Sequence, residues 1–95
     1  MNSNTYRFST RDDERFLTQN GIELNMSPSP NWGWYGVDTS WTAFRLLFVE
    51  YGVKTANKYF ARFAREYLAE MDCDEFTWTS GAIAVMIKQL EDTDA

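Results

Sequence analysis

The chain has 95 residues, of which 44% are hydrophobic and 17% aromatic, and its formal net charge is −5 at pH 7. This length predicts a single domain over residues 1–95 with loose ends at 1–5 and 92–95, and the aromatic content excludes a disordered chain. The charge is uneven, because residues 1–65 carry +2 and residues 66–95 carry −7.

The composition also argues against most catalytic and metal chemistry. The sequence has no histidine, so it lacks the usual general base and the commonest metal ligand. The one cysteine, Cys73, can form neither an internal disulfide nor a tetrahedral thiolate zinc site. We therefore expect no enzyme, no cofactor and no metal site. The N-terminus does not resemble a signal peptide, and no apolar run is long enough for a bilayer, so we expect a cytoplasmic protein without membrane contact.

The N-terminal part of the chain predicts a short strand followed by a helix. Residues 6–8 read as the strand. The acidic residues 12–14 then suit the first turn of a helix over 11–19, where they complement the helix dipole. Gly21 follows Asn20 and would end that helix.

The next stretch predicts a β-hairpin over residues 21–37. Residues 22–26 alternate between apolar and polar, which is the period of a strand. Residues 27–31 contain both prolines and read as the turn. In residues 32–37 the two tryptophans are spaced to lie on one face of a second strand.

The stretch from Trp41 to Tyr51 predicts the central helix. Its apolar residues go almost all the way round a helical wheel, which is typical of a helix in a protein interior. Two amphipathic helices should follow it. The expected fold is thus α+β and mostly α, with the central helix sandwiched between the hairpin and the last two helices. The four predicted helices span 11–19, 40–51, 55–71 and 79–91.

The helix over 55–71 carries the most distinctive charged surface. A basic strip of Lys54, Lys58, Arg62 and Arg65 lies opposite its aromatic face. Basic residues near a helix start oppose the helix dipole, so the strip is not explained by helix stability. It reads either as a solvated face, as a surface paired with the acidic C-terminal part, or as a site for phosphates or an acidic protein.

The aromatic residues Trp32, Trp34 and Tyr35, with Trp41, form the second candidate site. Aromatic side chains next to an apolar helix are usually core. If exposed, they are typical anchors of a protein interface or the floor of a ligand pocket.

We therefore expect a small protein-binding module or inhibitor that occupies a partner's surface, a type that phages and other mobile elements carry. A nucleic-acid-binding regulator that uses the basic strip is one alternative. A small-molecule binder with a tryptophan-lined pocket is another. A homodimer through helix 55–71 or helix 79–91 is also open.

Overall fold

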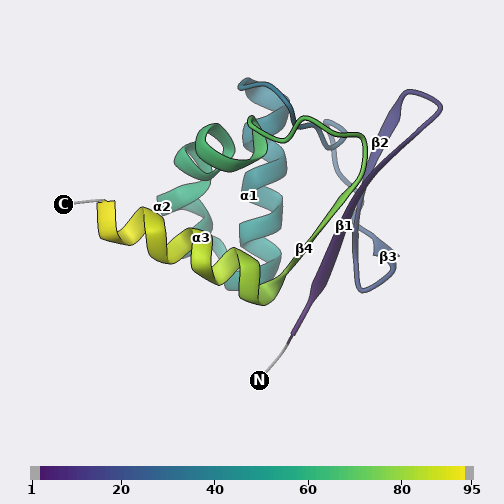
Figure 1. Cartoon of the computed structure of the whole chain (residues 1–95). Coiled ribbons are helices and arrows are strands. Elements are labelled where there is room, and N and C mark those ends of the chain that lie inside the picture. The colour runs from purple at the N-terminus through teal and green to yellow at the C-terminus, as the bar shows by residue number, and fades with distance from the viewer. Residues whose placement is uncertain (1–2, 94–95) are drawn as a thin grey trace.

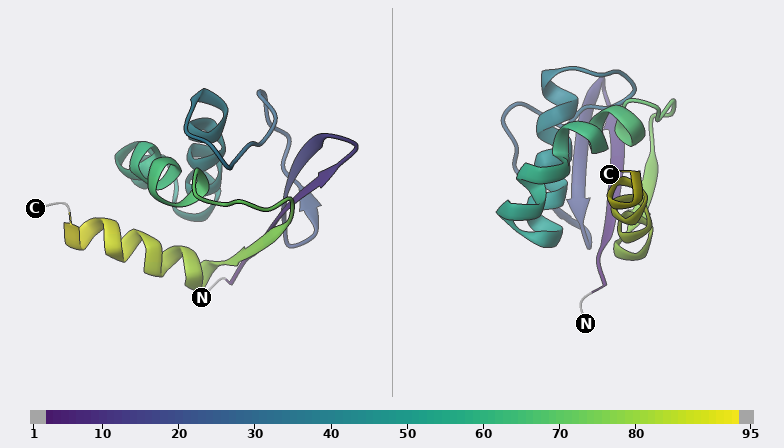
Figure 2. Two further views of the ribbon diagram at one scale, coloured as in Figure 1. Left: turned by 45° about the horizontal axis from the view of Figure 1, so that its top comes forward. Right: turned by 90° about the vertical axis from the view of Figure 1, so that its left-hand side faces the viewer.

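The chain folds into an antiparallel sheet with its helices gathered on one face, as the computed structural model shows for residues 3–93 (Figures 1 and 2). The strands are ordered β3-β2-β1-β4. The α+β class is confirmed. The elements are β1 Thr5–Arg11, β2 Glu14–Gln19, β3 Ile22–Glu23, α1 Val37–Tyr51, α2 Val53–Phe63, a π-helical turn η1 Ala64–Leu68, β4 Phe76–Thr79 and α3 Ser80–Thr93.

Three of the four predicted helices are confirmed. The central helix over 40–51 is α1, although it begins earlier, at Val37. The helix over 55–71 corresponds to α2 followed directly by η1, and the helix over 79–91 is α3. Gly52 separates α1 from α2 with a φ of 97°, a conformation that favours glycine.

The predicted loose ends lie partly outside the described residues. Within them, the Asn4 backbone N–H donates to the Ser80 hydroxyl at 2.8 Å, and Thr5 already belongs to β1. At the other end, α3 continues through Asp92 to Thr93.

The predicted helix over 11–19 is wrong, because this stretch forms the hairpin of β1 and β2. Arg11 pairs with Glu14, and the two residues between them, Asp12 and Asp13, have φ values of 52° and 65°. Positive φ at both central residues defines the tight turn that suits a β-hairpin. The acidic run therefore marks a turn and not the first turn of a helix.

The predicted hairpin over 21–37 is also wrong. Only Ile22–Glu23 forms a strand, β3, and it pairs with β2. Asn20 and Gly21 both have positive φ and make a second tight turn between β2 and β3. The Asn-Gly pair is a strong hairpin signal, but it closes a hairpin with the preceding strand instead of ending a helix. Residues 24–36 cross from the sheet to α1 without regular structure.

The core lies between the sheet and the helices, and Trp32 lies at its centre with 1% of its surface exposed. Its ring packs edge-on against Phe8 at 5.6 Å and Phe76 at 5.2 Å, and the Arg15 guanidinium lies 4.1 Å from its centroid. Its indole N–H donates to the Cys73 carbonyl at 2.7 Å. One side chain thus fastens two irregular segments, 24–36 and 72–75, to the sheet.

A carboxylate joins β1 to α1. Glu50 accepts hydrogen bonds from the Tyr6 hydroxyl at 2.7 Å and from the Asn4 side-chain amide at 2.9 Å. Burial of the Tyr6 ring, the hydrogen bond to Glu50 and the charge of Glu50 all raise the pKa of Tyr6 above its ordinary value of about 10.

Helix α1 is not sandwiched in the interior as predicted. Its inner side buries small and aliphatic residues such as Ala43, Leu46 and Leu47. Its outer side leaves Val37 and Trp41 with 69% and 51% of their surfaces exposed. The apolar residues of α1 therefore divide into one set that is buried in the core and another that is exposed at the molecular surface.

Replacing the central tryptophan tests the packing of the core. We expect Trp32→Ala to lower the free energy of unfolding by about 3–5 kcal/mol, because it leaves a cavity and an unpaired Cys73 carbonyl. Trp34→Ala removes a ring that is 48% exposed and should cost about 1 kcal/mol or less. Urea denaturation followed by circular dichroism measures both. Equal losses for the two variants would contradict the placement of Trp32.

The raised pKa of Tyr6 makes the fold sensitive to alkali. The unfolded chain loses the tyrosine proton at about pH 10, before the folded chain does, so this contribution to stability is complete below that pH and is lost as the pH rises past it. The pKa values of Tyr51 and Tyr67 are raised too, chiefly by burial, so they share the effect. We expect Tyr6→Phe to be less stable than the wild type at neutral pH by about 1–3 kcal/mol.

The same variant should lose less stability than the wild type between neutral and strongly alkaline pH. Denaturation of both proteins across that range measures the difference. Parallel pH profiles would show that the Tyr6 hydroxyl does not titrate differently on folding.

Candidate functional site

A stripe of large apolar side chains runs along the outer side of α1. The stripe comprises Val37, Trp41, Phe44, Phe48 and Tyr51, which follow one another at intervals of 4, 3, 4 and 3 residues. This spacing keeps all five on one side of a helix, as in the seam of a coiled coil. Four of the five are exposed at the surface, between 39% and 69%, and Phe44 is half-buried.

Ring contacts hold this stripe in place. The Phe44 ring lies 5.8 Å from Trp41, 6.2 Å from Phe48 and 5.5 Å from Phe60 of α2, measured between centroids. Phe44 is thus the fixed base of the stripe, and α2 supports it from one side. The outer parts of Trp41 and Phe48 are presented on a rigid helix and not on a mobile loop.

Two residues before α1 extend the stripe. Trp34 and Tyr35 are 48% and 51% exposed. A side chain at Gly36 would overlap the Trp34 ring, so glycine is what lets that ring fold back beside the start of α1. We call the whole surface the aromatic face. Its members are Trp34, Tyr35, Val37, Trp41, Phe44, Phe48 and Tyr51.

A groove lies on each side of Trp41. The first groove, of about 360 Å³, is lined by Tyr35, Val37 and Trp41 and by Phe60 of α2. The second groove, of about 260 Å³, is lined by residues 25–28 and by Trp41, Phe44 and Arg45. Trp41 thus forms a ridge between the two grooves. Another helix can pack on such a surface by placing its own side chains in the grooves.

The aromatic face is large for a protein of this size. Its five exposed aromatic side chains are about half accessible, which leaves roughly 350–550 Å² of aromatic surface in water. The largest apolar patch of a typical monomer is about 300–600 Å² and is often functional. The face therefore reaches that range before its aliphatic members are counted.

A cation without a partner borders the aromatic face. Within residues 3–93, Arg45 forms no salt bridge, and its buried Nε atom has no hydrogen-bond acceptor. Desolvating an unpaired guanidinium N–H is costly, so an acceptor at this position would be strongly favoured. The guanidinium lines the second groove, where a carboxylate from outside could reach it.

The structure divides the predicted basic strip. Lys54, Lys58 and Arg65 are exposed. Arg62 instead turns toward the C-terminal end of α3, where it donates to the Leu90 carbonyl at 3.2 Å and to the Thr93 hydroxyl at 2.7 Å. It also pairs with Glu66 at 3.1 Å. Arg62 therefore agrees with the interpretation that the strip pairs with the acidic C-terminal part. The other three cations of the strip remain at the surface.

The predicted aromatic site is divided as well. Trp32 belongs to the core, whereas Trp34 and Tyr35 join Trp41 at the surface. A tryptophan-lined pocket would therefore have these three as its walls, without Trp32. Our sequence interpretation missed Phe44, Phe48 and Arg45 because it assigned the whole helix to the interior. The alternating intervals of 3 and 4 between its large apolar residues were the available signal.

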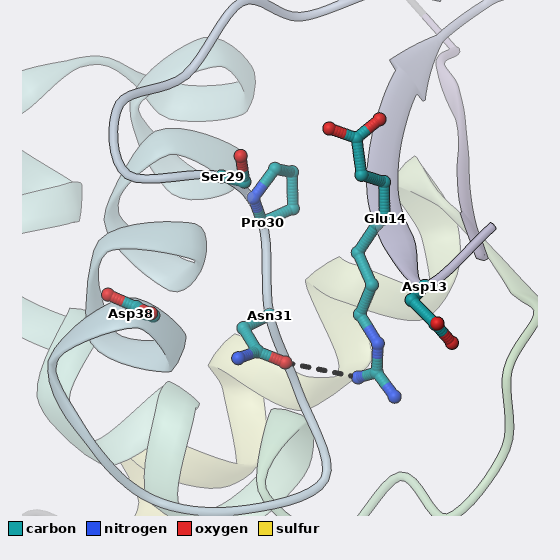
Figure 3. A pocket seen from close by; sticks show the side chains of 7 residues that line it. Asp13, Glu14, Ser29, Pro30, Asn31 and Asp38 are labelled. Atoms are coloured by element: carbon teal, nitrogen blue, oxygen red, sulfur yellow. Dashed lines mark hydrogen bonds between the residues drawn. The ribbon is translucent and has the colours of Figure 1, made fainter. Parts of the chain in front are cut away.

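A polar hollow of about 400 Å³ lies beside the loop that precedes α1, between the start of β2 and the start of α1 (Figure 3). Arg15 donates to the Asn31 side-chain oxygen at 3.2 Å across it. Asp13, Glu14 and Asp38 line it, but Figure 3 shows their carboxylates spread over different walls. Within residues 3–93 no three acidic or cysteine side chains are grouped to hold a metal ion. We therefore do not assign a site to this hollow.

Comparisons with protein-family models, with curated proteins and with solved structures found no match to this chain. Among the helices of residues 3–93, none has the length and apolar character needed to cross a membrane.

Exchanging single cations tests how the basic strip is divided. We expect Arg62→Gln to lower the free energy of unfolding by about 1–3 kcal/mol, because it removes the bonds that fix the end of α3. Lys58→Gln removes the same charge from an exposed position and should change stability by less than about 0.5 kcal/mol. Thermal or urea denaturation compares the two variants. An effect of Lys58→Gln as large as that of Arg62→Gln would contradict this division.

Proposed function

We propose that the chain is a non-catalytic protein-binding module that acts in the cytoplasm by occupying the surface of a partner protein. Inhibitors carried by phages and other mobile elements work in this way. The exposed aromatic face of α1 is the observation that carries the proposal, and we take it as the docking surface.

The chemistry of the face supports this role. Tryptophan and tyrosine are the residues most often found as energetic anchors of protein interfaces. Trp41 stands between two grooves, so a partner can surround it and exclude water from it. Its rigid helical support limits the side-chain entropy that binding would cost.

The magnitudes are consistent with a specific partner. Burial of roughly 350–550 Å² of aromatic surface contributes about 9–14 kcal/mol. Association costs about 4–15 kcal/mol in lost translational and rotational freedom. The two terms nearly cancel, so area alone does not give tight binding. A matching partner surface that also supplies an anion for Arg45 would add the missing affinity.

Nucleic-acid binding through the basic strip is a second candidate. The exposure of Lys54, Lys58 and Arg65 favours it. The commitment of Arg62 to α3 reduces the strip to three cations at the surface. Three phosphate contacts give a modest salt dependence of binding, with a slope of about −3 in log–log form, and little affinity at physiological salt. We therefore rank this function second.

Capture of a partner tests the proposed function. We expect immobilised wild-type protein to retain a specific partner from a cytoplasmic extract of the cells in which it occurs and Trp41→Glu to lose it, with affinity reduced about 30-fold or more, as for a central anchor. Ile22→Glu is the matched control, because Ile22 is 73% exposed but lies on β3, outside the aromatic face.

Two results would contradict the proposal. The first is retention of the same partner by wild type and Trp41→Glu alike, which would place docking elsewhere. The second is the absence of any specifically retained protein.

A further inference from the structure

We propose that one partner of the aromatic face is a second copy of this chain, and that the two α1 helices pack antiparallel across a twofold axis near the middle of the helix. This inference rests on the proposed function, because it names an occupant of the same docking surface.

The spacing of the stripe sets the register of such a pair. Residues at intervals of 4 and 3 form a seam, and in an antiparallel pair each layer of the seam joins one residue to another from the opposite end of the stripe. Trp41 then lies opposite Phe44 of the second copy, and Val37 lies opposite Phe48. Four members of the stripe thus meet an apolar side chain of the other copy, without any gap between them.

The charges beside the seam are complementary only in this orientation. Asp38 and Arg45 are seven residues apart, so they lie on the same flank of α1. Antiparallel packing brings Asp38 of each copy to Arg45 of the other, which gives two equivalent ion pairs. In a parallel pair the equivalent flanks of the two helices lie on opposite sides of the seam, so neither ion pair would form.

Both charged groups are available for this pairing. Within residues 3–93 neither Asp38 nor Arg45 takes part in a salt bridge. Arg45 has a buried Nε atom without an acceptor, and it lines the groove next to residues 25–28. A carboxylate that enters this groove from a second copy meets a guanidinium that forms no salt bridge within residues 3–93.

The area agrees with a small dimer. A stable interface buries about 800 Å² on each partner. The aromatic rings alone supply roughly 350–550 Å², and Val37 and the walls of both grooves add to this. The result lies at the lower end of the range for specific interfaces, so we expect a dimer that dissociates on dilution.

The other helices offer less apolar surface. On α2, Ala56, Tyr59 and Phe63 are buried within the chain. On α3, Ile83, Ile87 and Leu90 are buried, and Val85 is exposed at 59%. A homodimer through helix 55–71 or helix 79–91, which the sequence left open, would use surfaces that are mostly polar. We therefore propose that α1, and not α2 or α3, forms the dimer interface.

Exchange of the two charges tests the pairing. We would measure the molecular mass of the full chain by sedimentation equilibrium over a range of concentrations. The wild type should dimerise. Asp38→Arg and Arg45→Glu should each weaken the dimer about tenfold or more, because each creates two repulsive pairs. An equimolar mixture of these two variants should dimerise again, and so should the double variant, because both restore the two opposite-charge contacts. Arg65→Glu makes the same charge change on η1, outside the aromatic face, and should have no effect.

The design separates a lost contact from a lost fold. Recovery on mixing requires both single variants to be folded, and far-ultraviolet circular dichroism checks this directly. If either variant is unfolded, Asp38→Asn and Arg45→Gln replace them, and each should weaken the dimer less than the charge reversal does.

The outcomes also separate this inference from the proposed function. A wild type that stays monomeric at the highest concentration overturns the dimer, and the capture comparison of Trp41→Glu with Ile22→Glu then still decides whether the face binds another protein. A dimer that both charge reversals leave intact overturns the pairing through α1. A dimer that recovers only in the mixture and in the double variant supports it.

Discussion

The burial of the Trp32 ring against the sheet is the contact on which the remaining structure depends. The ring lies against Phe8 and Phe76 and over the Arg15 guanidinium, and its N–H binds the Cys73 carbonyl. It anchors the loop of residues 24–36, which leads directly into α1. Because that loop is fixed, Trp34 and Tyr35, which follow Trp32, lie at the surface. Helix α1 then packs one side against the core and exposes the other side to solvent.

The sequence predicted the α+β class and the three later helices because their signals are local. Gly52 ends α1, and the stripes of α2 and α3 repeat at the helical period. It did not predict the sheet, since two of its turns resemble helix signals. Asp12-Asp13 suited a first helical turn and Asn20-Gly21 suited a helix end, but both close hairpins. Whether such a stretch forms a strand or a helix depends on contacts with residues far along the chain, as when β4 pairs with β1.

The candidate site was predictable only in part. Trp34 and Tyr35 were identified as candidate binding residues, but no pattern separates them from Trp32, which is two residues away from Trp34 and buried. The outer stripe of α1 was hidden by its own apolar character, because a helix that is apolar on nearly all sides is usually interior. In a chain this small there is too little sheet and helix to cover every side of it. The basic strip was visible in the sequence, but the turn of Arg62 toward α3 depends on the tertiary fold.

The central claim is that the aromatic face of α1 makes contacts with another protein chain. The indole N–H signals of the four tryptophans in a ¹H–¹⁵N correlation spectrum test it directly, because Trp34 and Trp41 lie on the face while Trp32 and Trp78 are buried, at 1% and 8% exposure. The spectrum would be recorded as the protein is concentrated and as a captured partner is added. We predict that the Trp34 and Trp41 signals shift or broaden while those of Trp32 and Trp78 stay in place. Unchanged Trp34 and Trp41 signals under both conditions would contradict the account.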